Sequence, residues 1–163
     1  MSGGPVEPIV VLHDVSSVQR LVDMARLVYG LGLRYFVATR VYGAAAQTGV
    51  SEVMKLAFRM GRSFLVFNGV EDAVELFSPG LVLVFSREYG EEAGLEDLVG
   101  LILGAEKPML VFGGSETSIT KSVAGLGRPV YLRGVEGQLG PVAEAAIVLY
   151  GLVSRLAVSR GTS

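Results

Sequence analysis

The stretch Tyr131–Leu152 reads YLRGVEGQLGPVAEAAIVLYGL and joins a glycine-rich loop directly to a strongly apolar helical pattern. Pro141 suits a first helical turn because its φ is fixed near the helical value, and we expect the helix to run to about Val158. Its apolar residues cover more than one stripe of the helix: Ala143, Ala146, Ile147, Leu149, Tyr150, Val153 and Leu156. Such a helix is buried in its own domain or in a partner. We therefore predict a homodimer formed through this helix, with the core helix of a monomer as the alternative.

Six short runs rich in β-branched and aromatic residues precede this helix: PIVVLH, RYFVAT, SFLVF, LVLVFS, PMLVFG and RPVYLR. Continuous apolar strands are typical of a parallel sheet that is covered on both faces, and the segments between them supply helical crossovers. We therefore predict the α/β class, with a mostly parallel sheet of about six strands and helices on both faces.

The spacing of apolar residues predicts four more helices between the strands. They are one that follows a capping box at Ser16–Gln19 and ends at Gly30–Gly32, one from Ser51 to Gly61, a weaker one between Asn68 and Pro79, and one from Leu95 to about Leu103. The second should bury Val53, Leu56, Ala57 and Met60. No linker interrupts this pattern, so we expect residues 1–163 to form a single domain.

The composition narrows the function classes. The formal net charge of −2 lacks the basic balance of a typical nucleic-acid-binding domain, so an RNA role would depend on a local patch. There is no cysteine and only one histidine, His13, which argues against a metal site or a disulfide framework and suits a cytoplasmic protein. The apolar run Ala145–Val153 is shorter than a membrane span, so we expect no membrane role. The scarcity of asparagine and cysteine is compatible with a thermophile.

Two glycine-rich loops leave strands at the predicted carboxyl edge of the sheet. One is FGGSETS, which starts at Phe112 near the end of the run PMLVFG. The other is RGVEGQLGP, which follows Leu132. Ligands of open α/β sheets bind at this edge, where glycine lets the backbone approach a ligand closely. Neither loop has the spacing of a P-loop or of a dinucleotide fingerprint. They predict a nucleotide-like ligand, with simple turns as the alternative.

The segment PMLVFGGSETSIT…RPVYLRGVEGQLGPVAEAAIVLYGL resembles the closing third of the SPOUT class, the SpoU and TrmD type RNA methyltransferases. In that class a strand leads to a G-N-E-like loop, and a second strand ends in a pattern like I-P-M-x-G. A motif S-L-N-x-S and an alanine-rich helix ending in L-Y-E follow. Gly114–Glu116, Val130–Gly134, Gln138–Gly140 and the run EAAIVLYGL stand at these places.

The front of the chain is similar to SpoU members as well, where a helix carries N-x-G-x-x-x-R-x-A-x-x-x-G. With Gly32 as the final glycine, Arg26 stands at the arginine and Arg20 at the asparagine. The middle, QTGVSEVMKLAFRMGRSFLVF, resembles a less studied archaeal branch of the class. The asparagine of the first motif is absent, and Gln138 and Gly140 replace the serine and asparagine of the last, which weakens the case for ribose methylation in particular.

The resemblance implies a C-terminal trefoil knot and an S-adenosylmethionine-dependent enzyme that methylates tRNA or rRNA as a homodimer without a metal. It implies a cofactor grip by the backbone at Gly113, Gly114, Leu132, Gly134 and Leu139. Arg26 would be the catalytic residue, and Arg20, Glu116 and Arg133 would bind substrate.

Each of these residues has a structural alternative. Arg26 could be a solvated arginine that pairs with Asp23 one turn earlier, and Glu116 could cap a helix N-terminus. His13 and Asp14 follow the first strand, but a lone histidine there is more often structural, so neither is named as catalytic. A basic patch for RNA could form from a set of arginines that otherwise lie scattered on the surface: Arg20, Arg34, Arg40, Arg59, Arg62 and Arg133.

Two other functions stay open. The missing motif residues suit a non-catalytic RNA-binding or scaffold dimer that shares the fold. The glycine loops alone suit an α/β domain that binds another nucleotide or a phosphorylated metabolite.

Overall fold

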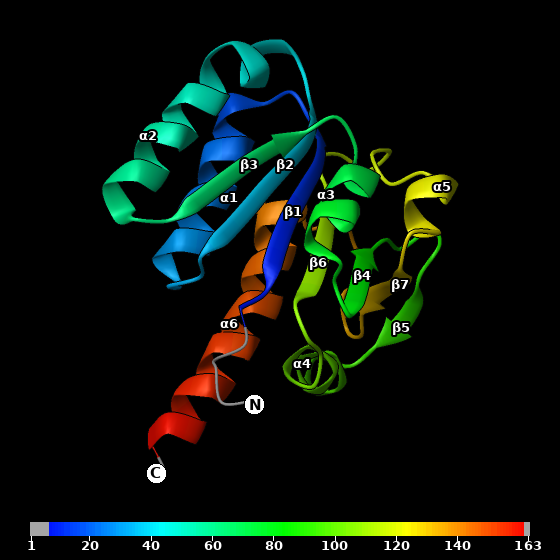
Figure 1. The fold of residues 1–163 in the computed structure, drawn as a ribbon. Helices are drawn as coiled ribbons and strands as arrows, with labels where there is room; N and C mark the ends of the chain where they lie inside the picture. Colours follow the sequence, from blue (N-terminus) through cyan, green and yellow to red (C-terminus); the bar gives the residue numbers. More distant parts are fainter. Residues whose placement is uncertain (1–6, 162–163) are drawn as a thin grey trace.

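Seven parallel strands form one twisted sheet in the computed structural model, which describes residues 7–161 (Figure 1). The strand order is β3-β2-β1-β6-β4-β7-β5. The strands are β1 (Ile9–Val15), β2 (Tyr35–Val41), β3 (Ser63–Phe67), β4 (Leu81–Phe85), β5 (Glu91–Ala93), β6 (Pro108–Gly113) and β7 (Arg128–Leu132). The predicted α/β class is confirmed, and all six predicted strands are present. The sheet is parallel throughout, and β5 is an additional short strand.

Helices cover both faces of the sheet, as predicted. One face carries α1 (Val18–Gly30), α2 (Val50–Met60), α4 (Leu95–Leu103) and α6 (Pro141–Gly161), and the other carries α3 (Val70–Phe77) and α5 (Lys121–Ala124). A π-helical turn, η1 (Ala45–Gly49), leads into α2. Neither η1 nor the four-residue α5 was predicted from the apolar spacing.

The alternation of side chains along each strand divides the core into two layers. Val10 and Leu12 of β1 pack under α1 and α6, whereas Ile9 and Val11 face the α3 layer. The same division holds for Leu110 and Val111 of β6. The first layer is the larger one, because four helices contribute their buried faces to it.

Two details of the predicted helices are corrected. The N-cap of α1 is Ser17, whose side chain accepts a hydrogen bond of 3.1 Å from the Arg20 N–H, so the capping box at Ser16 is wrong by one residue. In α2 the terminating glycine is confirmed, because Gly61 takes a left-handed conformation with φ 64°. Met60 is exposed rather than buried, since it lies beside Gly61 at the outer end of the helix.

The position of β7 shapes the part of the sheet that follows β6. Although β7 comes last in the chain, it lies between β4 and β5, which are joined directly by residues 86–90. At Gly90 an added Cβ would lie 2.3 Å from the Ser86 carbonyl oxygen and 2.7 Å from the Val130 amide nitrogen. Only glycine allows so close an approach of this connection to β7.

The long helix α6 buries one face and exposes another. Ala145, Val148, Leu149 and Leu152 are completely buried, and α6 packs against α1 and α4. Ile147 and Tyr150 are 40% and 64% exposed in the single chain. Residues 141–158 are also long and apolar enough to cross a membrane by length and composition alone, a test that the core helix of a soluble protein passes too.

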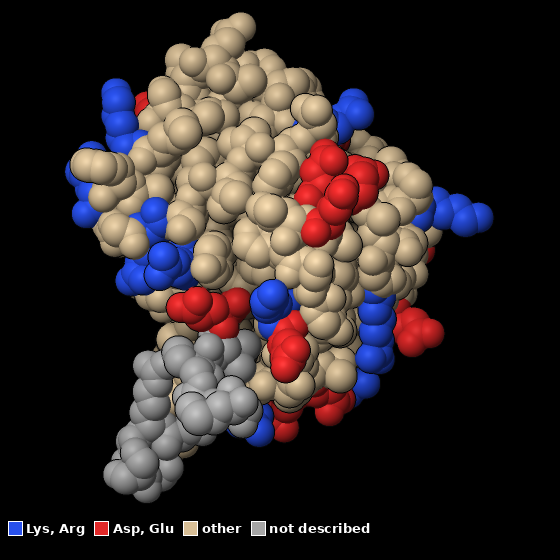
Figure 2. Space-filling model, viewed as in Figure 1, with Lys and Arg blue, Asp and Glu red and all other residues tan. Residues whose placement is uncertain are grey.

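Charge is unevenly spread over the surface. Glu71, Asp72 and Glu75 are exposed on α3, and Figure 2 shows carboxylates grouped at this place. In the same view, lysine and arginine side chains gather along the opposite margin, where the ends of α2, β2 and β3 lie in Figure 1.

Candidate functional site

Three loops at the carboxyl ends of β4, β6 and β7 enclose a cavity of about 690 Å³. The β4 loop contributes residues 85–88, the β6 loop residues 113–117 and 119, and the β7 loop residues 131–141 in part, with Glu144 of α6 and Arg20 of α1 completing the wall. The two glycine-rich loops singled out in the sequence therefore meet at one site. Its volume lies in the range of a nucleotide or cofactor pocket.

The β6 loop is fixed to the end of β1. The Gly114 N–H donates a hydrogen bond of 2.7 Å to the His13 carbonyl, and the Ser118 hydroxyl donates one of 3.2 Å to the Asp14 carbonyl. A Cβ at Gly114 would lie 2.3 Å from the Asp14 carbonyl oxygen, so glycine is required for this approach. The Arg20 guanidinium donates a further bond of 2.7 Å to the Gly114 carbonyl. The cavity wall formed by this loop is therefore preorganised.

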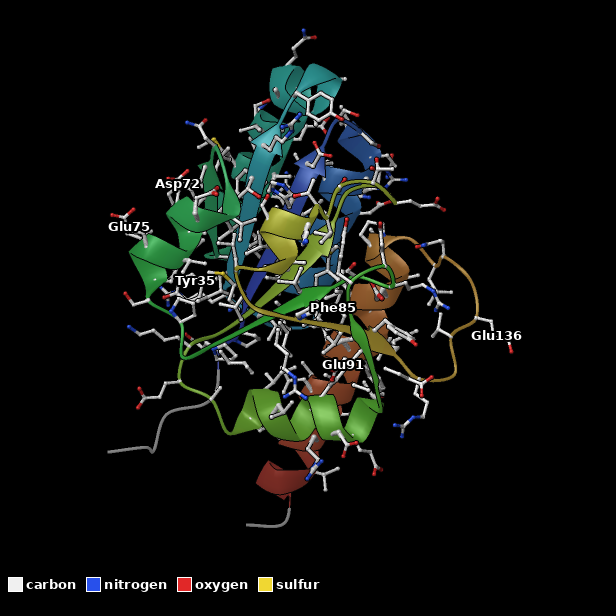
Figure 3. The ribbon with its side chains drawn as sticks, turned by 90° about the vertical axis from the view of Figure 1, so that its right-hand side faces the viewer. Tyr35, Asp72, Glu75, Phe85, Glu91 and Glu136 are labelled. Atoms are coloured by element: carbon white, nitrogen blue, oxygen red, sulfur yellow. The ribbon has the colours of Figure 1, made fainter. Side chains whose placement is uncertain are left out.

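The β4 loop holds the β7 loop through one arginine. The Arg87 guanidinium donates a hydrogen bond to the Val135 carbonyl and lies 5.1 Å from the centre of the Tyr131 ring. Figure 3 shows Phe85 directed into the centre of the molecule at the end of β4, and Glu136 pointing outward from the outermost part of the β7 loop. Arg87 thus connects two of the three loops that form the cavity.

The β7 loop presents its main chain to the cavity. Gly134 and Gly140 have φ values of 88° and 83°, and no atom within 4 Å would meet a Cβ at either of them or at Gly137. The N–H groups of Gly137, Gln138 and Leu139 have no backbone acceptor among the described residues. Free main-chain donors of this kind can bind the polar groups of a ligand.

One carboxyl group in the cavity has an unusual environment. Burial raises the pKa of Glu144 from 4.5 to about 7, and the positive charge of Arg87 opposes this rise. Glu144 stands in the first turn of α6 and lines the cavity. Near neutral pH it can therefore either hold or accept a proton at the site.

Most residues named from the sequence lie at this cavity. Gly113, Gly114, Leu132, Leu139, Arg20 and Glu116 line it. Gly134 stands between Leu132 and Val135, which both line it. Arg133 points elsewhere and forms an ion pair of 3.4 Å with Glu92. Arg26 is exposed on α1 and does not line the cavity of its own chain.

Several residues of the cavity were not named from the sequence, chiefly Arg87 and Glu144. The signal for Arg87 was its place directly after the strand LVLVFS. Glu144 is the one carboxylate in the otherwise apolar first turns of α6, which could have identified it as a residue with a polar task.

The structure divides the arginines proposed as one basic patch. Arg20 lies at the cavity, Arg40 pairs with Asp14 at 2.9 Å, and Arg133 pairs with Glu92. Arg34, Arg59 and Arg62 lie away from the cavity, around the amino ends of β2 and β3. The six arginines therefore do not form one patch, and the alternative of arginines that lie apart on the surface describes the set better.

His13 has the environment of a structural residue. It is 7% exposed, and its Nδ1 lies 2.8 Å from the Thr39 hydroxyl in a buried hydrogen bond. Burial lowers the pKa of its imidazole. Within residues 7–161 no three side chains of the histidine, aspartate or glutamate type are grouped so that they could hold a metal ion.

Comparison with known sequences gives a nuclease-like family description. The model of the family described as RecB-family nuclease (DUF2122) matches residues 43–151. A protein of Aeropyrum pernix is 49% identical over 153 residues, which cover 91% of this chain and 94% of the relative. A protein of Methanocaldococcus jannaschii is 29% identical over 147 residues, covering 89% and 95%. Both carry the name of a candidate type II restriction enzyme.

Comparison with solved structures gives a different description. A probable methylase family protein from Haemophilus influenzae has a TM-score of 0.78 at 15% identity, covering 98% of this chain and 69% of that chain. A structure described as giving insight into 2-OH methylation of C/U34 on tRNA has a TM-score of 0.73 at 16% identity, covering 95% and 99%. The SpoU methyltransferase AviRb from Streptomyces viridochromogenes, in complex with AdoMet, has a TM-score of 0.72 at 12% identity, covering 94% and 59%. These similarities establish a fold shared with SPOUT methyltransferases.

Proposed function

The chain belongs to the family described as RecB-family nucleases (DUF2122), and we propose that it is an S-adenosylmethionine-dependent methyltransferase that acts on tRNA or rRNA as a homodimer. The observation that carries this proposal is the cavity formed by the three loops after β4, β6 and β7. The shared fold supports it, and so does the insertion of β7 between β4 and β5, which is compatible with the predicted trefoil knot.

The residues of the cavity fit S-adenosylmethionine in three respects. Phe85, Ile119, Leu132 and Leu139 provide an apolar wall for a flat base. The free N–H groups of the β7 loop can donate to the polar edge of a base. The carboxylates of Glu88 and Glu116 can accept from ribose hydroxyls and favour a cationic ligand. The main-chain residues that would hold the cofactor are Gly113, Gly114, Leu132, Gly134 and Leu139.

The bound cofactor would supply a methyl group activated by its positively charged sulfur. The protein must then orient an RNA nucleophile and receive the proton that this nucleophile loses as its bond to the methyl carbon forms. Glu144 suits the second task, because burial keeps the pKa of its carboxyl near 7 and it lines the cavity. Arg87, which faces Glu144, limits this rise and keeps part of the carboxyl ionised at neutral pH.

Arg26 keeps its proposed catalytic role in a modified form. It lies outside the cavity of its own chain, on the exposed side of α1, and α1 packs against the predicted dimer helix α6. In a dimer formed through α6, Arg26 would reach the acceptor at the second protomer's cavity. Arg20 and Glu116 would hold the RNA at the rim of the cavity, and Arg133 would contact it from outside the cavity lining.

Calorimetric titration with S-adenosylmethionine and S-adenosylhomocysteine tests the cofactor site. We expect micromolar binding that is lost in Gly137→Val, because Gly137 lines the cavity and no protein atom lies within 4 Å of its Cβ position, so the added side chain would compete with the ligand for space. Gly100→Val is the matched control, since Gly100 also has open space around its Cβ position but lies in α4. Absence of binding to the folded wild type would refute the proposed cofactor.

Methyl transfer from labelled S-adenosylmethionine to total tRNA and rRNA tests the reaction. Cofactor binding without transfer would favour the non-catalytic RNA-binding dimer. Preference for ATP or a sugar phosphate would favour the nucleotide or metabolite-binding domain. The names of the relatives make a nuclease the other candidate, and it predicts cleavage of duplex DNA with Mg²⁺ by the same preparation.

A further inference from the structure

The charges of this acidic chain are divided sharply along its sequence. Residues 16–62 contain seven lysines and arginines but only two carboxylates, a net charge of +5. The rest of the chain contains seven cations and 14 carboxylates, a net charge of −7. Such an asymmetry often marks the part of a protein that meets a polyanion.

Folding brings five of these seven cations to one side of the molecule. We call Arg26, Arg34, Lys55, Arg59 and Arg62 the basic face. Helices α1 and α2, which carry three of them, pack side by side. The Ser63 N–H donates a hydrogen bond of 3.0 Å to the Arg34 carbonyl, and the Tyr29 hydroxyl donates one of 2.9 Å to the Ser63 carbonyl. These bonds hold the end of α1, Arg34 and the residue after Arg62 together.

Within the described part of the chain, no carboxylate forms an ion pair with the basic face. The two ion pairs found among the described residues are Arg40 with Asp14 and Arg133 with Glu92, and neither involves the five cations. All five are exposed except Arg62, which is half-buried. Figure 2 shows basic side chains gathered on this margin, away from the acidic surface of α3.

Large apolar side chains stand among these cations. Phe58 is 88% exposed and Met54 is 56% exposed, and with Lys55 and Arg59 they line a shallow groove on α2. An exposed aromatic ring flanked by cations has the chemistry of a surface on which an unpaired base stacks while the phosphates are neutralised.

We propose that the basic face binds the backbone of single-stranded RNA and that Phe58 stacks on one of its bases. The identity of the polymer as RNA rests on the proposed function. The face lies around α2 and the amino ends of β2 and β3, whereas the cavity lies at the carboxyl ends of β4, β6 and β7. Arg34, Lys55, Arg59 and Arg62 therefore form a separate anchoring surface, which contacts the substrate RNA away from the methylated nucleotide. Arg26, at the edge of the face, would lead from this surface to the acceptor at the second protomer's cavity.

The test is the fluorescence anisotropy of a labelled single-stranded RNA of about 20 nucleotides, titrated with the full chain at several salt concentrations. In Lys55→Glu/Arg59→Glu we expect the Kd to rise at least about tenfold and the salt slope of log Kd to fall by about two. Lys121→Glu/Arg128→Glu makes the same change of charge at exposed positions outside the face and should leave both unchanged. Wild-type affinity and salt slope in the first variant would overturn the proposal.

A second variant separates stacking from charge. Phe58→Ala should raise the Kd about tenfold while the salt slope stays that of the wild type, because no cation is removed. Unchanged affinity would refute the stacking role. Duplex DNA of the same length that binds more tightly than the RNA would refute RNA as the occupant. Matching circular dichroism and thermal unfolding of all variants show that they are folded.

Calorimetry on the same variants distinguishes this proposal from the enzymatic one. Lys55→Glu/Arg59→Glu should bind S-adenosylmethionine like the wild type, since neither residue lines the cavity. RNA affinity that depends on Lys55 and Arg59 in a protein without cofactor affinity would support the face and refute the methyltransferase. Cofactor affinity in a wild type without RNA affinity would support the cofactor site and overturn the role of the basic face.

Discussion

The Arg20 guanidinium donates a hydrogen bond of 2.7 Å to the Gly114 carbonyl, although the two residues lie 94 positions apart. This bond ties the first turn of α1 to the loop after β6, the same loop whose Gly114 N–H bonds to the end of β1. Hydrogen bonds from a charged donor are stronger than neutral ones. The position of one cavity wall therefore depends on a side chain from the first helix.

Arg20→Ala should loosen this wall without unfolding the protein. We expect a loss of about 1–3 kcal/mol of stability, the usual value for a hydrogen bond to a charged group, and about tenfold weaker binding of S-adenosylmethionine. Urea unfolding and calorimetry measure the two effects. Arg26→Ala is the control on the same helix, since Arg26 does not line the cavity, and it should keep cofactor affinity while lowering methyl transfer. Equal cofactor affinity in Arg20→Ala and the wild type would contradict the role of Arg20.

Glu144 should make the stability of the fold depend on pH. Burial raises its pKa from 4.5 to about 7, so between these values the folded protein holds a proton that the unfolded chain has lost. Proton binding by Glu144 therefore stabilises the folded state. This contribution is fully present below about pH 4.5 and is lost as the pH rises through about 7. The free energy of unfolding should fall across this window by at most about 3 kcal/mol. We expect a smaller fall than this upper bound, because the carboxyl is partly solvated.

Urea unfolding between pH 4.5 and 8 measures this slope. Glu144→Gln should remove the part of this slope that the carboxyl contributes, whereas Glu136→Gln, at an exposed position of the β7 loop, should retain it. The lowered pKa of His13 acts in the opposite direction and is present in both variants. If Glu144→Gln keeps the wild-type slope, another group is responsible. In the enzymatic reaction the same substitution should lower kcat and flatten its rise with pH, because the amide cannot accept a proton.

Gly114 and Gly137 are both cavity glycines, but they should respond differently to alanine. A Cβ at Gly114 would lie 2.3 Å from the Asp14 carbonyl oxygen and 3.1 Å from the Val15 Cα, whereas a Cβ at Gly137 would meet nothing within 4 Å. We expect Gly114→Ala to cost about 1–3 kcal/mol of stability through backbone displacement, and Gly137→Ala to change stability by less than about 0.5 kcal/mol. Thermal unfolding of the two variants measures this difference in stability. Equal stabilities would show that the backbone of the β6 loop can shift to accommodate the added Cβ.

The sequence predicts the sheet well where each strand is a continuous apolar run, as in PMLVFG. It does not predict β5, because Glu91 and Glu92 are exposed at the sheet edge and carry no apolar signal. Pairing with β7, which lies far away in the sequence, determines this strand. The glycine loops do identify the cavity, because close approach of two backbone segments requires glycine and glycine is visible in the sequence.

The charged residues of the site were harder to predict. Glu144 owes its raised pKa to burial in the folded protein, and Arg87 owes its role to contacts with Val135 and Tyr131. Arg40 and Arg133 resembled members of a basic patch in the sequence, but the fold places a carboxylate beside each. Spacing along the chain determines none of these pairings.

The exposed side of α6 should be the dimer interface that the sequence predicts. Tyr150 is 64% exposed and Ile147 40% exposed on a helix whose opposite side is fully buried, and an apolar surface of this kind is usually covered by a partner. Tyr150→Glu should therefore convert a dimer into a monomer, because a carboxylate cannot be buried at an apolar interface without a partner. Size-exclusion chromatography with light scattering at micromolar concentration measures the mass. Leu76→Glu, at an exposed leucine of α3 on the other face of the sheet, should remain dimeric. A wild type that is already monomeric would refute both the interface and the cross-protomer role of Arg26.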